Sequence, residues 1–242
     1  MAKKLAILGY HKIGAPSAGG WETWYYVPTA TFEKQMRQLQ DAGWCAIDAS
    51  KLLAAIDTPE ILPDRSVLIT FDDGYRSVLR EAAPVLLRMR LPAVIFVPTR
   101  FIGSASTFDE NSPEPLEPIC SWSELGELER AGISVQSHGV SHRAFSELSP
   151  DQIEWELTES KAALQRGLNK KVQLFSYPYN DPGVRRSDLG FGIWDFAGSA
   201  LFRAGYKAAF HFLGGVASWP LQDLFHITRV PVWPDSNLLN EL

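Results

Sequence analysis

The chain has 242 residues, of which 45% are hydrophobic and 21% charged, a composition typical of a globular protein and not of a disordered or fibrous one. Its formal net charge is −5, so it lacks the basic character of a nucleic-acid-binding protein. No apolar run approaches the ~18–20 residues of a membrane-spanning helix. The length fits one large domain, and we expect a single domain over residues 1–242.

The first apolar run, Leu5-Ala6-Ile7-Leu8, is shorter than the ~7–15 apolar residues that a signal peptide needs. We therefore interpret Lys4–Leu8 as a strand. This interpretation predicts a cytoplasmic protein, or an extracytoplasmic one if a leader has been removed.

Short apolar strands alternate with amphipathic helices along the whole chain. The expected strands are Lys4–Leu8, Trp44–Ile47, Ser66–Phe71, Ala93–Val97, Ile133–Gln136, Val172–Phe175, Lys207–Phe210 and Phe225–Arg229. Two of the helices between them begin with capping boxes, at Ser121 and Ser149. This alternation predicts an α/β protein, and its seven or eight units fit a distorted (β/α) barrel, which we take to have seven strands.

A doubly wound open sheet is the alternative fold. No Gly-x-Gly-x-x-Gly follows the first strand, which argues against a nucleotide-binding sheet. The one long irregular stretch, residues 101–120, is rich in proline, serine and acidic residues. Loops of this length are commonly functional, and we expect a lid here.

Polar side chains follow several expected strands at their carboxyl ends. Asp72 and Asp73 follow Ser66–Phe71, His138 and His142 follow Ile133–Gln136, and His11 follows Lys4–Leu8. In a barrel these loops share the face on which catalytic groups collect. The sequence therefore predicts that two carboxylates and three imidazoles converge in one mouth.

His138 and His142 have the spacing of two imidazoles that bind one metal ion, and an aspartate would complete three ligands with open positions, as in catalytic zinc sites. The other aspartate is then free to act as a base. Simpler interpretations also exist. Two loop histidines can form ordinary hydrogen bonds, and Asp-Asp-Gly can be a turn.

Three segments resemble the first three motifs of polysaccharide deacetylases, carbohydrate esterase family 4. They are Thr70-Phe71-Asp72-Asp73-Gly74-Tyr75, the Ser-His-x-x-x-His of 137–142, and Phe175-Ser176-Tyr177-Pro178-Tyr179. The likeness extends over nearly the whole chain. It implies a distorted (β/α) barrel and metal-dependent hydrolysis of N-acetyl or O-acetyl groups on an amino sugar or polysaccharide.

By this resemblance, Asp73, His138 and His142 bind a divalent metal ion, expected to be zinc, with cobalt, nickel or another divalent ion as alternatives. Asp72 is the general base, and the backbone N–H of Tyr179 stabilises the oxyanion. An acid must also protonate the leaving amine nitrogen, because an amide anion is too basic to depart unaided.

The chain departs from the family pattern in the third motif. Ser176 stands where many members have an arginine that orients the catalytic aspartate, and Asn180 replaces the usual glycine. The fourth motif, an acidic pair with tryptophan, has no match. Asp72 still needs a cationic partner, and Arg229, late in the last expected strand, is the candidate for this base-orienting role.

In lacking these parts, the chain resembles the branch of biofilm poly-N-acetylglucosamine deacetylases. In that branch a Tyr-His after the first strand supplies the histidine that other members carry near the C-terminus. His226 superficially matches the family's fifth motif. However, it lies near the start of its strand and hence toward the opposite face of a barrel, whereas His11 follows the end of a strand. We therefore expect His11 to be the general acid.

Tyr75 and Trp122, the latter just after the long loop, are the candidate substrate contacts. Two other functions stay open: an amidase acting on a small non-sugar substrate, and a catalytically silent carbohydrate-binding domain. The intact set of Asp72, Asp73 and the two histidines argues against the silent domain, because a binding module has no use for a base beside a metal.

Overall fold

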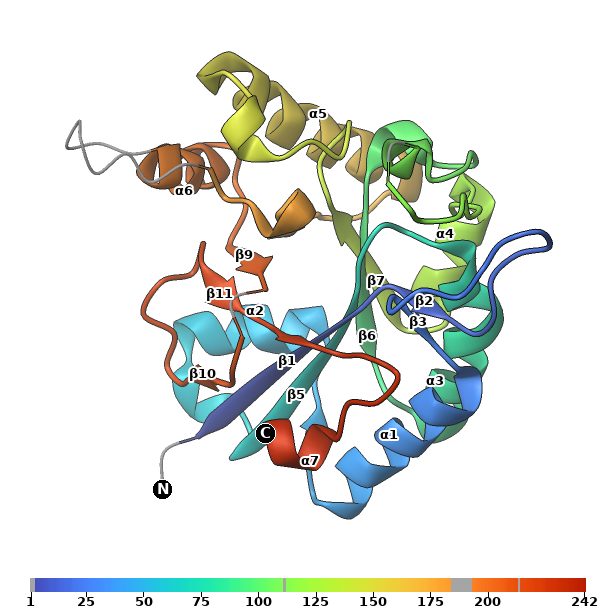
Figure 1. Ribbon diagram of the computed structural model, residues 1–242. Coiled ribbons are helices and arrows are strands. Elements are labelled where there is room, and N and C mark those ends of the chain that lie inside the picture. Colours follow the sequence, from blue (N-terminus) through green and yellow to red (C-terminus); the bar gives the residue numbers. More distant parts are fainter. Residues whose placement is uncertain (1–2, 111, 184–192, 213) are drawn as a thin grey trace.

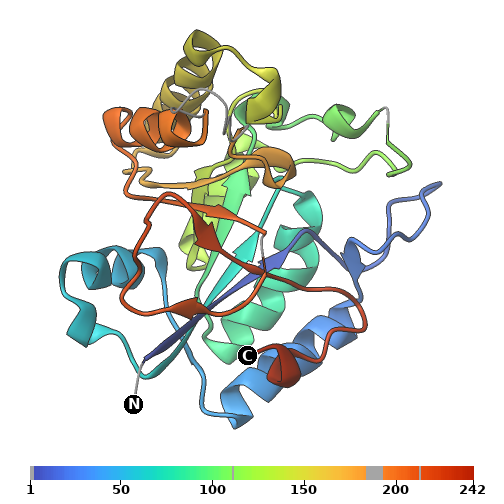
Figure 2. The same ribbon diagram turned by 60° about the vertical axis from the view of Figure 1, so that its left-hand side comes forward.

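The computed structural model describes residues 3–110, 112–183, 193–212 and 214–242, and its strands form a central barrel with the helices around the outside (Figures 1 and 2). The main sheet has the order β10-β1-β5-β6-β7-β8-β9-β11, with β12 paired to β1 and β4 paired to β5. These strands are β1 (Lys4–Tyr10), β4 (Cys45–Ala46), β5 (Arg65–Phe71), β6 (Ala93–Val97), β7 (Ile133–Ser137), β8 (Leu174–Ser176), β9 (Ala208–His211), β10 (Ala217–Ser218), β11 (Ile227–Thr228) and β12 (Val230–Pro231). A second small sheet pairs β2 (Lys12–Ile13) with β3 (Tyr26–Val27).

The α-helices are α1 (Thr29–Asp41), α2 (Ala49–Asp57), α3 (Ala83–Met89), α4 (Trp122–Arg130), α5 (Pro150–Leu168), α6 (Ile193–Arg203) and α7 (Leu238–Glu241). The capping boxes expected at Ser121 and Ser149 are both present and begin α4 and α5. Both views place α7, near the C-terminus, beside α1. Among the described residues, no helix is long and apolar enough to cross a membrane.

One short segment, residues 227–231, closes the barrel. Its first half, β11, runs parallel to β9, and its second half, β12, runs parallel to β1. Between them the N–H of Arg229 donates to the carbonyl of His211, and beyond them Val232 donates to Gly9. In place of the one strand expected at 225–229, the structure has two short strands, β11 and β12. One pairs with β9 and the other with β1, so that together they join the two edges of the sheet.

The expected barrel is confirmed, with one difference in strand number. The main path contains eight strands where seven are expected, because β10 adds an antiparallel strand at the edge of β1. The pairs from β1 through β5, β6, β7, β8 and β9 to β11 are all parallel. Their carboxyl ends therefore open on the same face.

Alternate residues of the strands enter two different apolar clusters, as expected for strands buried on both faces. Ala6 and Leu8 of β1 join the cluster that includes the inner faces of α1, α4 and α5. Leu5 and Ile7 join the other, to which β5, β6, β8, β9 and β11 all contribute. This second cluster lies on the other face of the strands and also includes Leu52 and Ala55 of α2.

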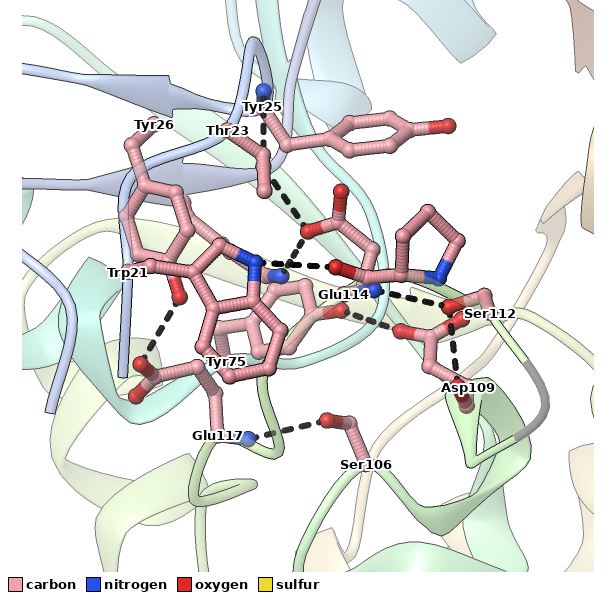
Figure 3. Close-up of polar contacts among 12 residues, drawn as sticks. Trp21, Thr23, Tyr25, Tyr26, Tyr75, Ser106, Asp109, Ser112, Glu114 and Glu117 are labelled. Carbon is pink, nitrogen blue, oxygen red and sulfur yellow. Dashed lines mark hydrogen bonds and ion pairs between the residues drawn. The ribbon is translucent and has the colours of Figure 1, made fainter. Parts of the chain in front are cut away.

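The loop formed by residues 101–120, expected to be a lid, packs against the loop of residues 14–25 (Figure 3). The buried Glu117 carboxylate accepts the N–H and hydroxyl of Ser17 at 2.7 and 2.5 Å and the hydroxyl of Tyr26 at 2.8 Å. The indole N–H of Trp21 donates to the Pro113 carbonyl at 2.9 Å. The described part of the loop is thus held as one wall of the opening at the barrel's carboxyl end.

Replacing Glu117 with glutamine removes a charged acceptor from buried donors, and we expect a loss of about 2–4 kcal/mol in the free energy of unfolding because hydrogen bonds to charged groups are worth ~1.5–3 kcal/mol each. Thermal unfolding and the rate of proteolysis within 101–120 measure the effect. Glu110→Gln is the matched control, because Glu110 is exposed on the same loop. Equal stability of the two variants would contradict this role of Glu117.

Candidate functional site

A cavity of about 550 Å³ opens at the carboxyl ends of the strands. This is the face on which barrel enzymes build their sites. Its walls combine aromatic rings with a few polar groups, the usual character of a ligand site. The cavity is lined by His11, Lys12, Trp24, Tyr25, Asp72, Asp73, Tyr75, Asp109, Ser112, Pro113, Glu114, His138, His142, Tyr177, Tyr179, Asn180, Phe212, Pro231 and Trp233.

Asp72, which follows β5, forms a bidentate ion pair with the fully buried Arg229, with N–O distances of 2.8 and 2.6 Å. Arg229 also donates to the hydroxyls of Ser176 and Thr70. Burial raises the pKa of Asp72, but Arg229 and then His138 lower it more, so that the pKa of Asp72 lies below its ordinary value. Asp72 is therefore held ionised and fixed in direction.

Asp73, His138 and His142 form the one cluster of potential metal ligands found among the described residues, with their ligand atoms within 4.8 Å of one another. Asp73 Oδ1 lies 3.3 Å from Nε2 of His138 and 3.0 Å from Nε2 of His142. Burial raises the pKa of Asp73, yet His142 and His138 bring it well below its ordinary value. A carboxylate thus faces two imidazoles in a buried place.

The residues fit a divalent cation. Nδ1 of His138 lies 2.7 Å from the carbonyl of Ser176, which only accepts, so Nδ1 carries a proton and Nε2 is the atom that can offer a lone pair to a metal ion. Asp73 Oδ1 is buried and accepts no hydrogen bond from the described residues. Lone pairs that converge in this way repel one another unless a cation or protons lie between them.

The loop that carries both histidines is held by Glu156 of α5. This buried carboxylate accepts the N–H groups of Val140 and Ser141 at 2.6 and 3.0 Å and also the hydroxyl of Ser141. Partners outside the ligand shell that fix ligands in this way tune metal affinity. Glu156 thus fixes the spacing of His138 and His142.

The backbone around the cavity is strained. Asp73, His142, Tyr179 and Asn180 have φ between 54° and 70°, the left-handed region that non-glycine residues avoid. The other described non-glycine residues with positive φ, Arg90 and Asn169, terminate helices, where this conformation is common. Strain of this kind, roughly 1–3 kcal/mol per residue, gathers at functional sites.

His11 is held by aromatic rings. Tyr25 meets its ring edge-on at 4.7 Å between centroids, and Phe212 stacks on it at 5.7 Å. Among the described residues no hydrogen bond to the His11 side chain occurs. Burial lowers the pKa of His11, against the opposing attraction of Asp73 and Asp72.

Phe212 is itself fixed on three sides. Its ring lies 4.0 Å from the guanidinium carbon of Arg229. The side-chain amide of Asn180 donates to its carbonyl and accepts its N–H. A Cβ on Gly9 would lie 2.1 Å from the Phe212 ring, so the ring sits where only glycine leaves space.

The structure brings most of the predicted site residues into this cavity: His11, Asp72, Asp73, Tyr75, His138, His142 and Tyr179 line it, and Arg229 lies behind Asp72. His226 lies elsewhere, in a separate surface hollow where it pairs with Asp223 at 2.8 Å. Trp122 also lies outside the cavity. Its indole packs against Gly167 of α5, in the space that a Cβ on that residue would occupy.

Several cavity residues are absent from the sequence-based prediction: Lys12, Trp24, Tyr25, Asp109, Glu114, Phe212 and Trp233. Three of them had a signal in the sequence. Trp24 and Tyr25 belong to an aromatic run before the first helix, and Trp233 directly follows the Arg229-Val230-Pro231-Val232 segment. Asp109 and Glu114 come from the long loop of residues 101–120, Lys12 belongs to the short strand β2, and Phe212 directly follows β9.

Comparison with known proteins agrees with this fold. PplD, a deacetylase of Streptococcus pyogenes solved in complex with acetate, superposes with a TM-score of 0.80 at 23% identity, over 100% of this chain and 99% of that one. IcaB from Ammonifex degensii gives a TM-score of 0.76 at 24% identity, over 98% of this chain and 94% of that one. These similarities establish a shared fold.

Two curated relatives are similar in sequence. YxkH of Bacillus subtilis (strain 168), whose name describes a polysaccharide deacetylase, is 29% identical over 191 residues, 76% of this chain and 61% of that protein. The poly-beta-1,6-N-acetyl-D-glucosamine N-deacetylase of Staphylococcus aureus (strain MRSA252) is 28% identical over 186 residues, 70% of this chain and 61% of that protein. The chain thus spans about three fifths of the length of these relatives.

The family model for polysaccharide deacetylases matches residues 60–187, more than half of the chain. That range contains Asp72, Asp73, His138, His142 and Tyr179, five of the residues that line the cavity. The chain therefore belongs to the polysaccharide deacetylase family.

Proposed function

We propose that this chain is a metal-dependent deacetylase that hydrolyses N-acetyl groups on amino-sugar residues of a polysaccharide. The observation that carries the proposal is the convergence, in one cavity, of a three-ligand metal cluster, an ionised aspartate and a histidine on aromatic rings. Family membership and the name of the Staphylococcus aureus relative support this class of substrate.

In this proposal Asp73, His138 and His142 hold the divalent ion, and zinc suits two imidazoles with one carboxylate. When bound, the ion supplies positive charge that polarises the acetyl carbonyl and makes water more acidic. Cobalt and nickel accept the same ligands. Three protein ligands leave open positions, as a catalytic site requires.

Asp72 acts as the general base. Water adds through its oxygen to the acetyl carbonyl carbon while Asp72 accepts a water proton. Arg229 is a positioning residue, because its bidentate contact keeps Asp72 ionised and fixed. The backbone N–H of Tyr179, in the cavity wall, donates to the developing oxyanion.

His11 acts as the general acid. As the C–N bond breaks, His11 donates a proton to the nitrogen, and the products are acetate and a free amine on the sugar. Tyr25 and Phe212 fix the plane of the imidazole, a task that a carboxylate performs in many other hydrolases.

Removal of the metal tests the proposal directly. Chelation should abolish acetate release from N-acetylglucosamine oligomers, and zinc should restore it. His138→Ala should lose both bound zinc and turnover, because two remaining ligands hold a catalytic ion poorly. Elemental analysis gives the zinc content, and His226→Ala serves as the matched control that keeps it. Full zinc occupancy in His138→Ala would show that the ligand set is wrong.

The two adjacent aspartates should separate by their zinc content. Asp72→Asn keeps the size of the side chain but not its basicity, so we expect a loss of ~10²–10⁴ in kcat with zinc retained. Asp73→Asn should lose zinc as well. Undiminished acetate release by Asp72→Asn would make Asp72 a structural residue.

Arg229 should set the acidic limb of the pH–rate profile. Without the guanidinium, burial raises the pKa of Asp72, so that protonation inactivates the base at higher pH than in the wild type. Arg229→Met should therefore move the acidic limb upward, and Arg229→Lys should move it less. Loss of a buried partner destabilises the fold by ~3–5 kcal/mol, so rates are measured well below the unfolding temperature of each variant. An unmoved limb would exclude this role.

His11 and His226 compete for the role of acid. We expect His11→Gln to lower kcat strongly with zinc content unchanged, because protonation of the amine is lost, and His226→Gln to have little effect. Acetate release and elemental analysis are the readouts. The opposite pattern would make His226 the general acid and would contradict the assignment of His11.

A further inference from the structure

The chemistry of the reaction defines which wall of the cavity meets the sugar, an argument that rests on the proposed function. The bond that breaks joins the acetyl carbon to the amine nitrogen. The acetyl carbonyl must lie at the Asp72–Asp73 end, and the nitrogen must lie within reach of His11. The pyranose ring is attached to that nitrogen and must therefore continue beyond His11, away from the metal ligands.

Three aromatic residues, Trp24, Tyr25 and Trp233, line the cavity in a series of ring contacts that begins at His11, and we call them the aromatic platform. Tyr25 contacts His11 edge-on. Trp24 stacks on Tyr25 with centroids 3.7 Å apart and an angle of 30°, and Trp233 meets Trp24 edge-on at 4.3 Å. All three line the cavity, yet Trp24 is 52% exposed. The rings thus form a continuous chain of stacked and edge-on contacts from the acid to the rim of the cavity.

Polar acceptors from the loop of residues 101–120 line the same cavity (Figure 3). The Glu114 carboxylate is fixed by Lys12 at 2.6 Å and by the Thr23 hydroxyl at 2.8 Å. Asp109 accepts the Tyr75 hydroxyl at 3.1 Å. Burial and the nearby Asp73 raise the pKa of Asp109 to about 6. Both carboxylates keep acceptor capacity beyond these contacts.

A pyranose has an apolar face of C–H groups and a rim of hydroxyls. An exposed aromatic ring matches the first, and fixed carboxylates match the second. Lys12 does not make the wall positive, because its ammonium pairs with Glu114 and lies 4.8 and 5.0 Å from the rings of Tyr26 and Tyr75. The wall is therefore suited to a neutral, hydroxyl-rich ligand.

We propose that the aromatic platform is a sugar-binding subsite, in which Tyr25, beside His11, contacts the acetamido sugar and the exposed Trp24, with Trp233, contacts the next residue of the chain, while Asp109 and Glu114 accept hydrogen bonds from the sugar hydroxyls. The continuity of the platform with His11 and its exposure at the rim give the subsite a direction. A glycan leaves the cavity over Trp24 and Trp233.

Trp122 is the matched comparison within this chain. Its exposed fraction, 40%, is similar to that of Trp24, but Trp122 lies outside the cavity and packs on Gly167. Exposure alone therefore does not distinguish the two tryptophans, and their position relative to His11 does.

The test uses the full chain with zinc and a tetramer of N-acetylglucosamine as the substrate. Trp24→Ala and Trp233→Ala should each raise KM for acetate release about tenfold, with a smaller change in kcat, because the platform binds substrate and transition state alike. Trp24→Phe should restore most of the loss, and Trp122→Ala should leave KM at the wild-type value. KM values for the platform variants equal to that of Trp122→Ala would overturn the subsite.

Calorimetric binding of the same tetramer separates this inference from the proposed function. If the wild type releases no acetate, the proposed function fails, and the affinity for the tetramer then decides on the subsite alone. Affinity that falls about tenfold in Trp24→Ala and not in Trp122→Ala supports the subsite. Tetramer binding that is undetectable in the wild type, or equal in all variants, overturns it.

Discussion

The ion pair between Asp72 and Arg229 is the interaction on which both the barrel and the site depend. Arg229 lies where the closing segment passes from β9 to β1, and Asp72 lies at the end of β5. The Arg229 guanidinium also donates to Ser176 at the end of β8, and the ring of Phe212 covers the guanidinium. A buried guanidinium without its carboxylate is strongly destabilising, so the closing segment is tied to one register.

This coupling explains how a site assembled from five separate strand ends stays well ordered. Several side chains of the site are held by groups from other elements: Asp72 by Arg229, His138 by the Ser176 carbonyl, and the 138–142 loop by Glu156 of α5. Such supports fix the positions of polar groups before a substrate arrives, which is the main way in which an enzyme stabilises developing charge. The strained backbone at Asp73 and His142 is tolerated for the same reason.

The sequence predicts those features that depend on strand ends. Asp72, Asp73, His138 and His142 converge because parallel strands end on one face, and the choice of His11 over His226 follows from the same rule. The sequence does not predict that Trp122 lies outside the cavity or that the last strand is divided at Arg229. Where a loop travels after leaving a strand, and how two sheet edges share one segment, are set by long-range packing that no local pattern encodes. The aromatic residues of the platform are visible in the sequence, but their meeting in one wall depends on this packing.

Gly9 has a consequence for how this chain can vary. The ring of Phe212 occupies the space of a Cβ at position 9, and that ring in turn supports both His11 and the guanidinium of Arg229. A side chain at position 9 is therefore compatible only with a smaller residue at position 212, and that exchange would remove the support of His11 and of the Arg229 guanidinium together. Positions 9 and 212 are far apart in the chain and outside every catalytic motif, yet a substitution at one requires a compensating substitution at the other.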